Sequence, residues 1–145
     1  MPIATHNSDM ADFRKLEVWQ KAHTLVLAVN DVTHAMRGVE YTSLRSQMIR
    51  AAMSIDANIV EGRNQRTDRR FLHYLDIAVN SANELEAHFI MARDIGAMSA
   101  HDYMTLRDHL VHVMKMLHGL INKLSGIARS VDASVDVRNK PSAGS

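Results

Sequence analysis

The sequence of residues 103–127 is YMTLRDHLVHVMKMLHGLINKLSGI. Its apolar residues recur at alternating steps of three and four, the spacing that places side chains on one face of an α-helix. Ser99 precedes the stretch at an N-cap position, and Asp102 favours its first turn. The stretch therefore predicts a long amphipathic helix. The residues that keep the spacing are Tyr103, Leu106, Leu110, Val113, Leu117, Leu120, Leu124 and Ile127.

Three earlier segments, residues 19–36, 44–62 and 71–92, show the same period. Residues suited to helix ends lie around them: Asp12 and Gly38 for the first, Thr67 and Gly96 for the third, with the turn before the third at 63–66. Four helices with short links predict an all-α protein, an antiparallel up-down-up-down four-helix bundle over residues 13–129. Residues 1–12 are expected to form a flexible N-terminus. Residues 130–145 lose the apolar period and are expected to form a disordered tail.

Composition excludes several classes of protein. The 145 residues include no cysteine, which rules out disulfide scaffolds and cysteine-ligated metal sites. No apolar run approaches the ~20 residues of a membrane span, and the first ten residues lack the basic-then-apolar order of a signal peptide. We therefore expect a soluble, cytoplasmic protein with no membrane contact.

Sequence motifs of several enzyme and metalloprotein classes are missing. A di-iron bundle needs Glu-x-x-His on two helices, and none of the five glutamates has a histidine three residues later. Phosphate-binding glycine loops, His-Glu-x-x-His and Gly-x-Ser-x-Gly are also absent. His109 and His112 are helical neighbours, which we interpret as a surface pair, with adventitious nickel or zinc binding as the alternative. We expect no cofactor and no resident metal.

The first and fourth helices each carry a second apolar line. A helix in a monomeric bundle needs one apolar stripe, so a second line predicts an oligomer face. The alternative is one broad stripe that faces the core. A second copy of the chain or a different protein would cover such a face. The residues of the two lines are Val18, Leu25 and Val32, and Val111, Met114 and Ile121.

A polar line follows one side of the second helix, and Glu84 of the third helix is expected to face it. We interpret these residues as a structural network in which Arg50 pairs with Glu84. The alternative is an enzyme active site built from Arg50, Asn58, Glu61 and Glu84, with a glutamate as base and Arg50 as anion ligand. The line consists of Gln47, Arg50, Ser54, Asn58 and Glu61.

Charge is unevenly distributed although the net charge is +1. Residues 45–70 contain six arginines and three acidic residues, whereas residues 71–96 contain one arginine and four acidic residues. Arg63, Arg66, Arg69 and Arg70 surround the start of the third helix, where exposed N–H groups also favour anions. This basic cluster predicts contacts with RNA or DNA phosphates. The alternative is a solvated turn with local Arg–Asp pairs.

Several stretches resemble the four-helix-bundle family encoded by intervening sequences in bacterial 23S rRNA genes. They are FRKLEVWQKA at 13–22, SLRSQ at 43–47, RAAMSI at 50–55 and NIVEG at 58–62, followed by Arg66 and the third-helix residues Phe71, Leu75, Ser81 and Glu84. The resemblance covers residues 13–127. The chain departs from the family pattern at Asp56, where proline is common, and at Ile49, where a second arginine is common.

The resemblance implies a homopentameric ring with no established catalytic activity. It also implies kinship with the accessory variability protein of diversity-generating retroelements, a basic pentameric barrel that binds nucleic acid and its reverse transcriptase. We therefore expect a non-enzymatic, self-assembling scaffold or nucleic-acid-associated protein. The alternatives are a protein–protein adaptor that binds no nucleic acid and, more remotely, the enzyme described above.

Overall fold

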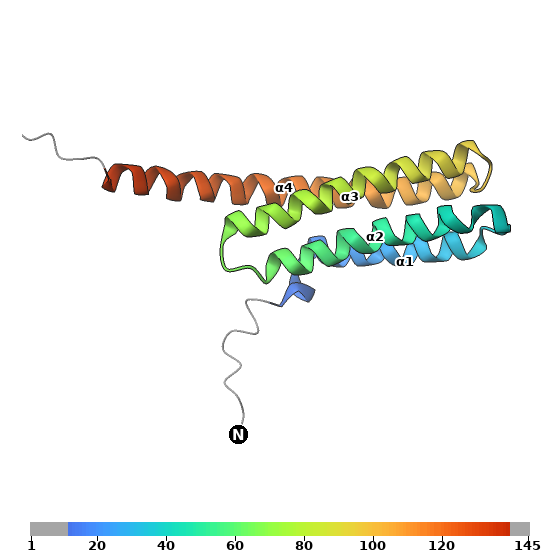
Figure 1. Ribbon diagram of the computed structural model, residues 1–145, viewed down its shortest axis with the longest axis horizontal. Helices are drawn as coiled ribbons and strands as arrows, with labels where there is room; N and C mark the ends of the chain where they lie inside the picture. The colour runs from blue at the N-terminus through green and yellow to red at the C-terminus, as the bar shows by residue number, and fades with distance from the viewer. Residues whose placement is uncertain (1–11, 140–145) are drawn as a thin grey trace, which may run out of the picture.

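The computed structural model describes residues 12–139, and within them it contains α-helices and short 3-10 helices but no strand. Each α-helix contacts the next along the chain, and α1 also contacts α4. The helices lie side by side as an antiparallel four-helix bundle, which confirms the predicted fold class (Figure 1). The elements are η1 Phe13–Lys15, α1 Glu17–Ala35, η2 Val39–Tyr41, α2 Thr42–Arg63, α3 Asp68–Asp94 and α4 Ala100–Arg138.

Most of the predicted helix ends are confirmed. The Thr67 side chain accepts a hydrogen bond from the backbone N–H of Arg70, and Ser99 accepts one from Asp102. Gly96 has a φ of 78° just beyond α3, a left-handed conformation that glycine adopts without steric cost. The turn before α3 lies at residues 64–67, one residue later than predicted.

Asp12 does not cap α1, contrary to the prediction. Its side chain accepts a hydrogen bond from the backbone N–H of Arg14 and caps η1. The Arg14 guanidinium also donates to Asp12, and this hydrogen bond lowers the pKa of the carboxyl group from its ordinary value. The helix α1 begins later, at Glu17, after Leu16, which has no side chain capable of capping.

The core lies between the four helices and contains the predicted faces of α2, α3 and α4. Gly62 shows how closely α2 and α3 approach, because a Cβ atom there would lie 2.6 Å from Cδ2 of Phe71. The α4 face is buried from Tyr103 through Leu117, and Leu124 is its last buried residue. The largest side chains that are fully buried include Phe89, Leu25, Met48, Ile55, Ile59, Leu75, Leu85 and Leu106.

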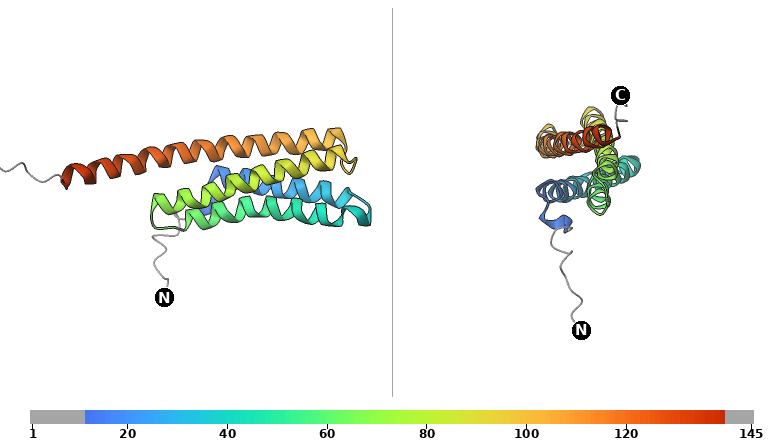
Figure 2. Two further views of the ribbon diagram at one scale, coloured as in Figure 1. Left: turned by 45° about the horizontal axis from the view of Figure 1, so that its top comes forward. Right: turned by 90° about the vertical axis from the view of Figure 1, so that its left-hand side faces the viewer.

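The helix α4 continues to Arg138, so the prediction of a disordered tail is wrong for residues 130–138. Figures 1 and 2 show α4 extending past the other helices, at the end of the bundle that holds the α2–α3 turn. Every described side chain from Gly126 to Arg138 is exposed. We call residues 126–138 the α4 arm. Residues 140–145, and residues 1–11 of the predicted flexible N-terminus, lie outside the described part of the chain.

Within residues 12–139, no helix combines the length and the apolar character that crossing a membrane requires.

Candidate nucleic-acid interface

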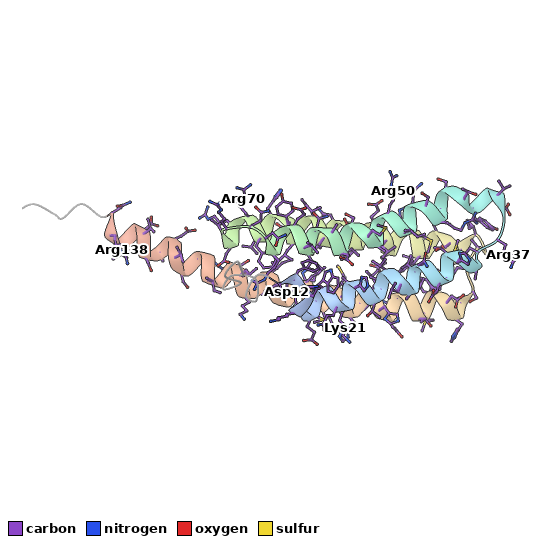
Figure 3. All side chains as sticks on the ribbon, turned by 90° about the horizontal axis from the view of Figure 1, so that it is seen from below. Asp12, Lys21, Arg37, Arg50, Arg70 and Arg138 are labelled. Carbon is purple, nitrogen blue, oxygen red and sulfur yellow. The ribbon has the colours of Figure 1, made fainter. Side chains whose placement is uncertain are left out.

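The basic cluster lies at the end of the bundle where α2 gives way to α3. Arg63 is the last residue of α2, Arg66 lies in the turn, and Arg69 and Arg70 belong to the first turn of α3. Arg66, Arg69 and Arg70 are exposed, whereas Arg63 is half-buried. Figure 3 shows Arg70 at this end of the bundle, toward the tip of the α4 arm at Arg138.

The arginines of the basic cluster differ in their partners. Arg69 forms an ion pair with Asp132, which belongs to the α4 arm. Among the described residues, the side chains of Arg66 and Arg70 form no ion pair or hydrogen bond. The local Arg–Asp pairs of the alternative interpretation are therefore not seen at these two residues within the described part of the chain, whereas their exposure agrees with a solvated turn. The acidic partner of Arg69 lies 63 residues further along the chain.

The predicted polar network exists in part between α2 and α3. The Oγ atoms of Ser54 and Ser81 lie 2.8 Å apart and join the two helices by a hydrogen bond. The Asn58 amide donates to the backbone oxygen and to the Oγ of Ser54, at 2.8 and 3.2 Å. Two hydroxyl groups and one amide therefore satisfy one another at this half-buried contact, which holds α2 and α3 together by neutral hydrogen bonds.

The predicted Arg50–Glu84 ion pair does not form. Glu84 lies 3.3 Å from Nε2 of His88, one turn away on the same helix, and Arg50 has no partner among the described residues. Both side chains line an open hollow of about 940 Å³, together with Gln47 and Ser54.

The remote alternative of an active site requires four side chains to meet, and they do not. Asn58 is turned to Ser54 on its own helix, and Glu61 is an exposed residue that does not line the hollow. The residues Arg50 and Glu84 share the hollow, but Arg50, Gln47 and Glu84 are exposed to solvent. An acid–base pair shielded from water is therefore not assembled from this set.

The oligomer face predicted on α1 is wrong for two of its three residues. Val18 is 4% exposed and Leu25 is 0% exposed, because both belong to the core line of α1 with Ala22 and Val29. The third residue, Val32, is half-buried and packs against the core. None of the three therefore forms a fully exposed face for a second chain.

The three residues of the apolar line predicted on α4 are all half-buried. Val111 and Met114 are half-buried and line an apolar groove of about 480 Å³ along α4, with Glu86 of α3 at its edge. Gly119 also lines this groove, and nothing lies within 4 Å of the position its Cβ atom would occupy. Ile121 is half-buried against the core. The groove leaves apolar side chains partly open to solvent on one side of the bundle.

A cluster around Asp56 escaped the sequence analysis. The indole Nε1 of Trp19 donates to Oδ1 of Asp56 at 2.6 Å, and Nδ1 of His23 lies 3.2 Å from Oδ2. The Trp19 and His23 rings stack with centroids 4.9 Å apart, and Phe13 meets the edge of the indole. A half-buried indole N–H needs a hydrogen-bond acceptor. The signal for this acceptor in the sequence is Asp56, an acidic residue among the apolar positions of α2.

The two histidines predicted to be helical neighbours lie on α4. His109 and His112 line a small hollow with Lys21, Thr24 and Asp108. Throughout residues 12–139, no three histidine or acidic side chains are grouped so that they could hold a metal ion.

Comparisons with known proteins agree with this fold. Residues 14–119 match the family described as 23S rRNA-intervening sequence protein. A crystal structure of a protein of unknown function from the S23 ribosomal protein family of Bacteroides thetaiotaomicron superposes with a TM-score of 0.65. It is 21% identical, and the similarity covers 72% of this chain and 97% of that chain. No curated protein matches the chain. Since the family match spans well over half of its residues, the chain belongs to the 23S rRNA-intervening sequence protein family.

Proposed function

We propose that this protein is a non-enzymatic, self-assembling helical bundle that binds the phosphates of RNA or DNA through its basic cluster. The observation that carries the proposal is the exposure of Arg66 and Arg70 without acidic partners among the described residues. Guanidinium groups bind phosphate oxygens with charge-assisted hydrogen bonds. Such contacts read no bases, so binding is expected to depend strongly on salt and weakly on sequence.

Self-assembly would multiply this interface. Four arginines on one chain are a modest cationic surface, whereas a ring presents one basic cluster per copy, and linked sites bind more tightly than single ones. The pentamer is the assembly that the resemblance to the family implies. The apolar groove that contains Val111 and Met114 supports an interface between copies, because apolar side chains that line a groove gain from removal from water.

The direct test is fluorescence anisotropy with a labelled RNA hairpin at low and at physiological salt. The variant Arg66→Gln/Arg70→Gln is expected to bind several-fold more weakly at both salt concentrations, since each arginine lost removes a phosphate contact. The matched control is Arg37→Gln/Arg107→Gln, which removes the same charge from two exposed positions outside the basic cluster. Absence of binding by the wild-type protein at low salt, or equal loss in both variants, would reject the proposal.

The second candidate is a protein–protein adaptor that binds no nucleic acid. The apolar character of the α4 groove favours it, because Val111 and Met114 offer a protein partner the same contact area as a second copy. Affinity capture with the wild-type protein and a Val111→Asp variant distinguishes the two. A partner that is retained after nuclease treatment and lost with the variant supports the adaptor. A groove occupied by a second copy gives a homo-oligomer in the purified protein instead.

A further inference from the structure

The α4 arm has few contacts to hold it against the bundle. It lies beyond residue 119, where the family match ends, and its described side chains are all exposed. Valines and serines such as Ser130, Val131, Ser134 and Val135 favour helix less than alanine or leucine does. The arm continues α4 beyond the other helices, and most helical stability in a protein comes from tertiary packing, which the exposed arm lacks. Its turns therefore open more easily than those inside the bundle, and a contact with another helix matters more there.

That contact is made by Asp132. Its carboxylate forms an ion pair with the guanidinium of Arg69, in the first turn of α3. The other described side-chain hydrogen bonds of the arm, from Arg129, Ser130 and Ser134, are to backbone oxygens one turn earlier in α4. The arm is thus tied to α3 at the basic cluster. The Asp132 carboxylate thus occupies Arg69, which a phosphate group would otherwise bind.

We propose that the α4 arm is a displaceable strap, in which Asp132 competes with nucleic-acid phosphates for Arg69. The inference rests on the proposed phosphate binding by the basic cluster. The side chains of Arg69 and Asp132 are 71% and 52% exposed, and an ion pair so open to solvent is weak. A phosphate group that is also within reach of Arg66 and Arg70 displaces it.

The first experiment compares two variants that remove one negative charge from the same arm. Asp132→Asn breaks the ion pair, whereas Asp136→Asn lies one turn further along and breaks no ion pair among the described residues. In the anisotropy assay, Asp132→Asn is expected to bind the RNA hairpin about two- to fivefold more tightly than Asp136→Asn, the range for an exposed ion pair. Equal affinities of the two variants would overturn the strap while leaving phosphate binding intact. If no protein binds the hairpin, the proposed function itself fails, and the strap fails with it.

The second experiment follows the arm directly. The chain contains no cysteine, so the double variant Asn64→Cys/Ser134→Cys carries spin labels only in the α2–α3 turn and in the arm. Without RNA we expect the main population of label-to-label distances to be that of the tied arm. Saturating RNA hairpin, or the added Asp132→Asn substitution, is expected to lower this population and to broaden the distribution. A distribution that is unchanged while RNA binds would show that phosphates do not displace the arm.

Discussion

The indole Nε1 of Trp19 donates a 2.6 Å hydrogen bond to Oδ1 of Asp56, and this bond joins α1 to α2. The same carboxylate faces His23, so one acidic side chain serves two partners on a neighbouring helix. Asp56 stands where the resemblance to the family leads one to expect proline. Asp56 therefore fixes two aromatic side chains on another helix, which a proline at this position could not do.

The first prediction concerns this contact. Asp56→Ala leaves the indole N–H without its acceptor, and loss of a partner from a shielded donor costs about 1–3 kcal/mol. In a protein of this size the melting temperature should fall by roughly 2–4 °C per kcal/mol. Calorimetry measures the loss. Trp19 is the only tryptophan, so its fluorescence reports the same site, and a shift of its emission is expected in the variant.

The control for Asp56 is Asp76, which is exposed on α3 and has no partner among the described residues. Asp76→Ala removes the same group and should leave the melting temperature and the Trp19 emission close to those of the wild type. An equal loss of stability in the two variants would mean that the Trp19–Asp56 bond contributes nothing beyond general charge effects.

The second prediction uses two glycines that have opposite surroundings. Gly62→Ala places a Cβ atom 2.6 Å from the Phe71 ring at the closest approach of α2 and α3. Overpacking of this kind costs about 1–3 kcal/mol, so the midpoint of urea unfolding should fall. Gly119→Ala meets nothing within 4 Å on the exposed side of α4 and should raise stability by about 1 kcal/mol, the usual gain for alanine in a helix. Stabilisation by both substitutions would show that α2 and α3 move apart enough to accommodate the added methyl group at residue 62.

The features predicted correctly from the sequence are those that depend on residues close together in the chain. The caps Thr67 and Ser99 act on N–H groups three residues away, and the α4 stripe repeats over many turns. The oligomer face on α1 was predicted wrongly at Val18 because Val18 and Trp19 begin two neighbouring apolar lines, and it is Trp19 that lies half-buried with its indole bonded to Asp56. Periodicity contains no information about such a distant partner.

The candidate site was predicted less well for the same reason. The basic cluster was located by counting charges, but its arginines differ through contacts that no local pattern contains. Arg69 is paired with an aspartate 63 residues away, in a segment that was expected to be disordered. The pairing of Arg50 with Glu84 was inferred from facing helices, whereas His88, one turn along α3, is the partner that Glu84 reaches.

The third prediction concerns self-assembly. Val111→Asp places a charge in the apolar groove of α4, where a second copy is proposed to dock, and burial of an unpaired charge is strongly unfavourable. Sedimentation velocity is expected to show a smaller species than the wild type, with unchanged helical content by circular dichroism. Met104→Asp is the control, because Met104 is an exposed apolar residue of α4 outside the groove. Assembly of Val111→Asp to the wild-type size would exclude the groove as the interface.

The fourth prediction concerns the number of phosphate contacts. The logarithm of the binding constant falls linearly with the logarithm of the salt concentration. Each lost phosphate contact makes this negative slope shallower by roughly one. For each chain that binds the RNA, Arg66→Gln/Arg70→Gln should therefore reduce the magnitude of the slope by about two. Arg69→Gln should lower it by less than one, because Asp132 already occupies Arg69 in the free protein. Anisotropy titrations with the RNA hairpin over a series of salt concentrations measure these slopes. Equal slopes in all variants, with affinity lost, would mean that the arginines support the fold of the turn rather than contact phosphates.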